Sequence, residues 1–106
     1  MMQFDKDLAS PNRDLFMSVR EHLLSYQEMT ETKKPRITTY SYGKGGICHM
    51  RTMPHGIDIG FLKGAKMLDQ HARLKGNGKA MRVLPLAETE VEIIEYYLRQ
   101  AIEFVR

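Results

Sequence analysis

The sequence is poor in the residues that build disulfide frameworks, metal clusters and membrane spans. It has a single cysteine, Cys48, so no disulfide can form within the chain and a cytoplasmic location is expected. No apolar run approaches the ~18 residues that a membrane span needs, and the first residues lack the apolar core of a signal peptide. His49, His55 and His71 lack the spacing of metal ligands. We therefore expect no membrane association and no resident cofactor.

The charge pattern argues against a nucleic-acid partner. The net charge is +3 and the sequence pI is about 9.1, but the basic residues are scattered and form no block that would follow a phosphate backbone. No nucleophile stands beside a base. Cys48 and His49 are adjacent in an expected strand, so they point to opposite faces and cannot easily pair. These observations predict a protein that is not an enzyme.

The length of 106 residues predicts one domain, and 42% hydrophobic residues are enough for a compact core. Residues 1–9 show no clear period and are expected to fray. Ser10 and Pro11 are typical of a helix start and predict a helix over residues 11–28. Thr89 and Glu92 have the spacing of a capping box and predict a second helix, whose apolar stripe is Val91, Ile94, Leu98, Ala101 and Val105.

The middle of the chain reads as strands. Residues 30–35 are expected to be a charged connector, and residues 63–79 a long connection with weak helical character over 65–74. Pro85 suggests either the end of a strand or the edge of a sheet. The predicted strands are 36–42, 47–53, 56–62 and 80–86. The prediction is an α+β domain: an antiparallel sheet of about four strands, with N- and C-terminal helices mainly on one face.

The turns predict a register. A two-residue loop at Pro54 and His55 pairs Arg51 with Asp58, as a cross-strand ion pair, and Cys48 with Phe61. A four-residue turn over 43–46 then divides the sheet into two faces. The expected core face carries Ile37, Thr39, Ser41, Cys48, Met50, Ile57, Ile59 and Phe61. The expected outer face carries Thr38, Tyr40, Tyr42, Ile47, His49, Arg51 and Asp58.

Two regions are candidates for a binding site. The first is the outer face, where Tyr40, Tyr42, His49 and Arg51 could line a pocket or a dimer patch; the alternative is an ordinary solvated sheet face. The second is a Gly-rich turn with three cations, where backbone N–H groups could hold an anion. Its residues are Lys75, Gly76, Gly78, Lys79 and Arg82. The alternatives are a simple turn with solvated lysines, and an Arg82 that pairs with an acidic residue of the C-terminal helix.

Three carboxylates are weak candidates for a metal site. Glu88, Glu92 and Glu95 would share one helical face, and hard carboxylate oxygens can hold iron weakly. The alternative is that acidic residues in a first helical turn complement the helix dipole.

Several motifs resemble one family. They are Tyr40–Gly43, Ile57–Phe61, Lys63–Ala65, Leu68–Asp69 and, most specific, Leu74–Arg82, followed by an amphipathic helix. The chain resembles the YdhG-like family of small bacterial domains of largely unknown function over about residues 15–105. The resemblance implies an α+β fold with an antiparallel sheet. It also implies a link to intracellular iron, since one member is described as a frataxin-like iron chaperone. The sequence departs from the family at 35–39, where a glycine and an apolar-Pro pair usually precede the tyrosine.

Three hypotheses follow. The preferred one is a non-enzymatic module that binds a small ligand or anion between the Tyr40 and His49 face and the basic turn at Lys79 and Arg82. The second is an intracellular iron chaperone. The third is an interaction domain that forms a homodimer through the tyrosine-bearing face.

Overall fold

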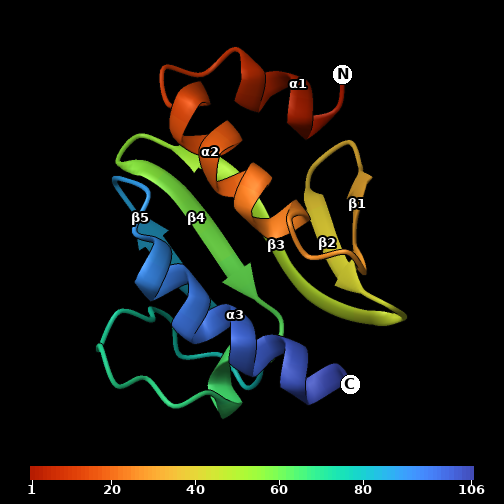
Figure 1. Ribbon diagram of the computed structural model, residues 1–106. Helices are drawn as coiled ribbons and strands as arrows, with labels where there is room; N and C mark the ends of the chain where they lie inside the picture. The colour runs from red at the N-terminus through yellow and green to blue at the C-terminus, as the bar shows by residue number, and fades with distance from the viewer.

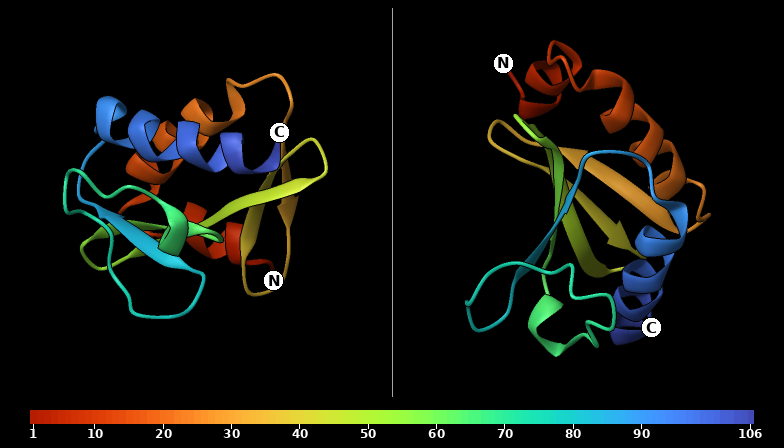
Figure 2. Two further views of the ribbon diagram at one scale, coloured as in Figure 1. Left: turned by 90° about the horizontal axis from the view of Figure 1, so that it is seen from below. Right: turned by 90° about the vertical axis from the view of Figure 1, so that its left-hand side faces the viewer.

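The computed structural model describes the whole chain, residues 1–106. Five antiparallel strands form one sheet in the order β1-β2-β3-β4-β5. Helices α2 and α3 lie on one face of the sheet, and α1 lies near one end of it (Figures 1 and 2). The predicted α+β fold is therefore confirmed, with five strands where about four were expected. The elements are α1 (Gln3–Leu8), α2 (Arg13–Leu24), β1 (Met29–Lys33), β2 (Thr38–Tyr42), β3 (Gly45–Met53), β4 (Gly56–Phe61), the 3-10 helix η1 (Gly64–Lys66), β5 (Arg82–Leu86) and α3 (Val91–Val105).

The N-terminal residues differ from the expectation that 1–9 fray, because they form α1 and contact the core. The ring of Phe4 packs edge-on against Phe16, with 5.7 Å between ring centroids. The Asp7 carboxylate accepts hydrogen bonds from the backbone N–H of Thr52 at 2.9 Å and from its hydroxyl at 2.7 Å. Thr52 lies beyond the last residue of β3 that pairs with β2. Asp7 thus satisfies a strand N–H that would otherwise lack a partner.

The start of α2 was predicted two residues too early. The helix begins at Arg13, and Ser10 uses its hydroxyl to accept the N–H of Asn12 at 3.0 Å. The amide of Asn12 donates to the carbonyl of Met53 at 2.7 Å. The helix ends at Leu24 rather than at residue 28. The Ser10–Pro11 pair therefore forms the turn that leads into the helix and not its first residues.

The capping box of α3 is not formed. The helix begins at Val91 with Glu90 as its N-cap, and no side chain caps it. The hydroxyl of Thr89 donates instead to the Ser18 hydroxyl of α2, at 3.0 Å. The apolar stripe is confirmed at its centre, where Ile94, Leu98 and Ala101 are buried. None of the helices is long and apolar enough to span a membrane.

The strand missed by the sequence is β1, which occupies most of the expected connector 30–35. The cause is the inward-facing charge of Glu31. Its carboxylate accepts two hydrogen bonds from Arg20 of α2, at 2.7 and 2.9 Å, and one from the Tyr40 hydroxyl at 2.8 Å. An edge strand whose inward residue is a paired carboxylate shows no apolar alternation.

The β3–β4 register is confirmed. Arg51 faces Asp58 and Cys48 faces Phe61, as the two-residue loop predicts. Arg51 and Asp58 are neighbours but not an ion pair, because Asp58 bonds to His55 at 2.8 Å instead. The inward residues are all buried: Cys48, Met50, Ile57, Ile59 and Phe61. Burial raises the pKa of the Cys48 thiol.

The β2–β3 register was predicted one residue out. Tyr42 pairs with Gly45 across a two-residue turn, and the register shifts between Tyr40 and Ser41, so that Tyr40 faces Cys48. A one-residue slip moves every side chain of a strand to the other face. Thr38 and Tyr40 are therefore buried in the core, and Thr39 lies on the outer face. The outer-face prediction is wrong for Thr38, Tyr40, Tyr42 and Ile47 and confirmed for His49, Arg51 and Asp58.

The last strand and the connection before it complete the fold. β5 is an edge strand that contains Pro85, as predicted, and its Leu84 and Leu86 side chains are buried. The connection holds only the short η1, so the weak helical character expected over 65–74 is limited to one 3-10 turn at its start. Residues 67–81 are irregular and cross beside α3 before entering β5 (Figure 2).

Candidate functional site

The sheet face opposite α2 and α3 is not covered by a helix (Figure 2). We call it the open face. Its side chains come from alternate positions of β2 to β5, and none of them is fully buried. Across the sheet these residues form two rows, one containing Thr39, His49 and Val83 and one containing Arg51, Asp58 and Pro85. This face is the most polar surface that the sheet offers.

The His49 side chain has a defined position on the open face. Its ring lies over Gly60, where an added Cβ would come within 2.4 Å of the ring atom Cε1 and 2.7 Å of Nε2. The Nε2 atom lies 3.1 Å from the sulfur of Met81. Burial lowers the pKa of His49, and the charge of Arg51 lowers it further. Both effects favour the neutral form of the imidazole, against the smaller opposing effect of the Asp58 charge.

Lys75 is brought to the open face by a short bridge outside the named strands. Its N–H donates to the carbonyl of Val83 at 2.8 Å, and the N–H of Val83 donates back at 2.9 Å. Gly76 follows with φ of 117°, a conformation that favours glycine. The bridge thus adds one more backbone segment to the edge of β5.

A pocket of about 490 Å³ lies where this segment meets β4 and β5. One wall is the hydrogen-bonded pair of His55 and Asp58, with 2.8 Å between Nε2 and Oδ1. The lining residues are His55, Asp58, Lys75, Gly76, Val83 and Pro85. Two of the sequence-predicted candidates, Lys75 and Gly76, line this pocket, and His49 lies in the adjacent row.

The rest of the Gly-rich turn is arranged differently. Arg82 folds back, and its Nη1 donates to the carbonyls of Gly78 at 2.5 Å and of Met81 at 2.9 Å. The alternative in which Arg82 pairs with an acidic residue of the C-terminal helix is therefore wrong. Gly78 and Lys79 are exposed at the tip of the turn. Arg82 thus closes the turn through its Nη1 atom.

Tyr40 is not part of any site. Its side chain is 1% exposed, and its hydroxyl donates to Glu31. Burial raises the pKa of Tyr40, and the neighbouring Glu31 charge raises it further. Burial acts to raise the pKa of Glu31 as well, but hydrogen bonds from Arg20 and Tyr40 bring it below its usual value. Tyr40 and His49 therefore lie on opposite faces and cannot share a ligand.

The three carboxylates proposed for iron are not brought together. Glu95 accepts a hydrogen bond from the Tyr26 hydroxyl at 2.5 Å and lies 3.2 Å from Nε2 of His22. Glu88 and Glu92 are exposed and make no such contacts. No group of three or more His, Cys, Asp or Glu side chains could hold a metal ion. Glu88 lies before the first residue of α3, so the predicted shared helical face of Glu88, Glu92 and Glu95 is wrong and the three carboxylates give no metal site.

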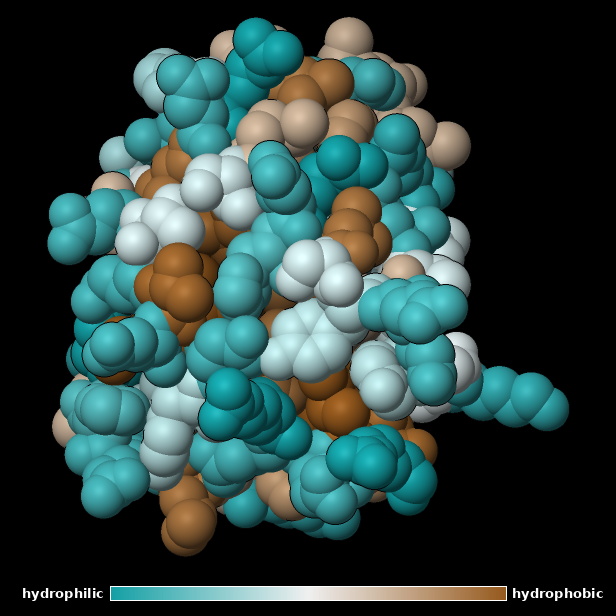
Figure 3. Space-filling model, in the orientation of Figure 1, coloured by the Kyte–Doolittle hydropathy of each residue, from teal (hydrophilic) through white to brown (hydrophobic).

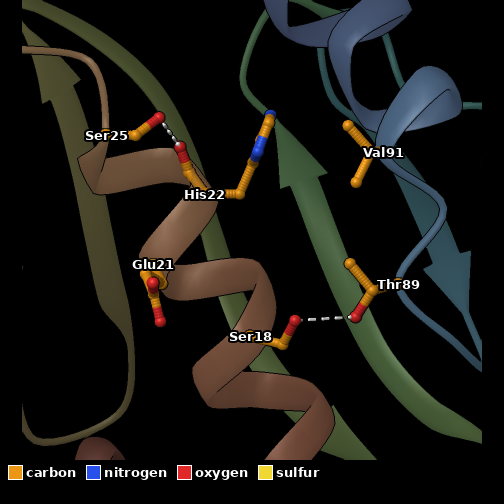
Figure 4. Close-up of a pocket in the computed structure, with 6 residues that line it drawn as sticks. All are labelled: Ser18, Glu21, His22, Ser25, Thr89 and Val91. Atoms are coloured by element: carbon orange, nitrogen blue, oxygen red, sulfur yellow. Dashed lines mark hydrogen bonds between the residues drawn. The ribbon is translucent and has the colours of Figure 1, made fainter.

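A second pocket, of about 300 Å³, lies between α2 and the start of α3 (Figure 4). The hydroxyls of Ser18 and Thr89 bridge it, and the ring of His22 points between the two helices toward Val91 (Figure 4). Sequence reasoning gave no sign of this pocket. The reason is that Thr89 was assigned to a helix cap.

Comparison with protein-family models, with curated proteins and with solved structures finds no match. The resemblance to the YdhG-like family therefore stays a prediction, and the function must be argued from the geometry.

Proposed function

We propose that the chain is a non-enzymatic module that binds a small organic anion in the open-face pocket. The observation that carries the proposal is the bridge between Lys75 and Val83. It places a lysine that forms none of the ion pairs of the chain beside a wall of the pocket. The N–H of Gly76 makes no backbone hydrogen bond, so it remains available as a second donor.

The lining favours a ligand with three kinds of groups. Lys75 and the Gly76 N–H suit a carboxylate or phosphate. Val83 and Pro85 offer an apolar surface for a short carbon skeleton. Asp58 can accept a hydrogen bond from a hydroxyl or an amine. A small hydroxy acid or amino acid combines these features, and its affinity should fall with salt because the pocket is open to solvent.

The test is an NMR titration of the backbone amides with glycolate and, separately, with inorganic phosphate. We expect shifts at Lys75, Gly76 and Val83 that shrink at high salt and vanish in Lys75→Ala. Lys44→Ala, on the distant β2–β3 turn, is the matched control and should bind like the parent chain.

A second variant separates the pocket from the tip of the turn. Lys79→Ala should leave the shifts unchanged, because Lys79 does not line the pocket. Binding that survives Lys75→Ala but is lost in Lys79→Ala would refute the pocket and move the anion to the tip. An absence of shifts at millimolar ligand would refute anion binding altogether.

A further inference from the structure

One contact on the open face joins two atoms that are soft metal ligands. Nε2 of His49 lies 3.1 Å from the sulfur of Met81, which stands 32 positions later in the chain. Imidazole nitrogen and thioether sulfur are both ligands of copper, and the thioether selects its monovalent form. Neither residue lines the open-face pocket. The pair is therefore separate from the anion site proposed above.

The other three histidines of the chain have partners of a different kind. Two of them lie against carboxylates, and one packs edge-on against a tyrosine ring. These pairs are His22–Glu95, His55–Asp58 and His71–Tyr96. On the face formed by α2 and α3 the apolar areas are small and separated by polar residues (Figure 3), and the histidine of α2 has a hard oxygen partner. The contact between imidazole and sulfur thus belongs to His49 and to the open face.

The imidazole is the fixed half of this pair. Its ring lies over Gly60, where the lack of a side chain leaves the space that the ring occupies. Burial lowers the pKa of His49, which favours the neutral imidazole that metal ions bind. A ligand atom that is already held in place loses little freedom when the ion arrives.

Met81 is the adaptable half of the pair. The backbone around it is anchored, because the carbonyl of Ala80 accepts the N–H of Ala65 at 2.8 Å and that of Met81 accepts Nη1 of Arg82 at 2.9 Å. The Met81 side chain itself is 42% exposed. Its three rotatable bonds and polarisable sulfur allow it to adjust.

The distance between the two donor atoms suits this division of roles. Bonds of about 2.0 Å to nitrogen and 2.3 Å to sulfur, the lengths that zinc forms, place the two donors roughly 3.5 Å or more apart around one ion. The present separation of 3.1 Å therefore has to widen slightly. A small rotation of the exposed Met81 side chain away from the fixed ring is enough.

The charges near the pair favour an ion with a single positive charge. Arg51 and Asp58 act on His49 with opposite signs, so no excess of carboxylate charge awaits a divalent ion. No group of three or more His, Cys, Asp or Glu side chains assembles here or elsewhere in the chain. Zinc and calcium sites need such groups. Copper(I) accepts fewer ligands, and thioether sulfur is one of them.

We propose that His49 and Met81 form a binding site for copper(I). Nε2 of His49 and the sulfur of Met81 supply two ligands, and the exposed side of the site stays open to water or to a ligand from another molecule. The spacing of the histidines in the sequence gave no sign of this site, because its second ligand is a methionine from a distant segment. The site goes beyond anion binding, and either can exist without the other.

An NMR titration with silver(I), a redox-stable probe for copper(I), tests the site in a chloride-free buffer. The methyl group of Met81 and the ring Cε1–H of His49 should shift together and saturate at a single equivalent. Zinc(II) should leave the Met81 methyl unshifted, because thioethers are soft ligands. Shifts centred on Cys48 or on the N-terminal methionines instead would overturn the proposal, and so would an absence of shifts at equimolar silver.

Variants test both ligands with copper(I) itself, kept reduced by ascorbate and measured against a competing chelator. Met81→Leu and His49→Phe keep the shape of each side chain and should each lower the affinity about tenfold or more. Met2→Leu is the matched control, because Met2 is 40% exposed and Met81 42%; it should bind like the parent chain. Circular dichroism should show all three variants folded. An affinity that Met81→Leu leaves unchanged would reduce the site to a surface imidazole and overturn the proposal.

Discussion

Replacing Gly60 with alanine tests how the open face is built. The added Cβ would lie 2.4 Å from Cε1 of His49, so the imidazole must leave its seat. Overpacking of this kind destabilises a fold by about 1–3 kcal/mol. Alanine in place of a glycine inside a strand stabilises it by roughly 0.5–1 kcal/mol. We expect a net loss of about 1–2 kcal/mol in the free energy of unfolding, which lowers Tm by roughly 4–8 °C for each kcal/mol in a domain of this size.

The assay is a double-mutant cycle in urea with His49→Ala as the second change. Without the imidazole ring the clash disappears, so Gly60→Ala should become neutral or slightly stabilising in the His49→Ala background. The coupling free energy between the two substitutions should be about 1–3 kcal/mol. NMR gives an independent reading. The pKa of His49, which burial lowers, should rise toward the ordinary value of histidine once the ring swings out. An equal loss of stability with and without His49 would refute this view of the open face.

Three further predictions concern the core. Phe61→Ala and Leu98→Ala should each cost about 2–5 kcal/mol, because both side chains are fully buried; a loss below about 1 kcal/mol in a urea melt would place the residue at the surface. Cys48 should react with a thiol reagent in the native protein far more slowly than in urea, because it is buried and its pKa is raised; equal rates would contradict its placement. The pKa of Glu31 is lowered by Arg20 against the effect of burial, so its contribution to stability should be present above the ordinary pKa of glutamate and lost as the pH falls through the folded value. Glu31→Gln should reduce the change of the urea midpoint with pH over this acidic range. An unchanged slope there would contradict the pairing of Glu31 with Arg20.

The hairpin of β3 and β4 could be read from the sequence because local chemistry determines it. A two-residue loop fixes the register of the two strands. The strict alternation of apolar residues over 56–61 gives the same register, because it places these residues together on one face of the sheet. The stripe of α3 was predictable for the same reason, since its period is set by neighbours in sequence. These are the parts of the fold in which each residue's environment depends on residues a few positions away.

The candidate site depends on contacts between distant residues, and these were only partly predictable. The glycine and lysine cluster drew attention to Lys75 and Gly76, and the alternation placed His49 on the outer face. Nothing local indicates that Lys75 pairs with Val83, or that Gly60 leaves space for an imidazole from the next strand. The pairing of Asp58 with His55 was hidden by the presence of Arg51 directly across the hairpin.

The missed strand and the misplaced Tyr40 have one physical cause. With a four-residue turn over 43–46, Tyr40 faces outward and an inward glutamate on a preceding strand would lack the Tyr40 hydroxyl as a partner. The real turn has two residues, and the extra residue of β3 is taken up by the register shift between Tyr40 and Ser41. That shift turns the Tyr40 hydroxyl inward to Glu31, and Arg20 supplies the neutralising charge from α2. An inward glutamate is stable only with these partners, because a buried carboxylate must be paired. The same shift removes Tyr40 from the open face, so any ligand there must be held by His49 and by residues that β4, β5 and the Lys75 bridge provide.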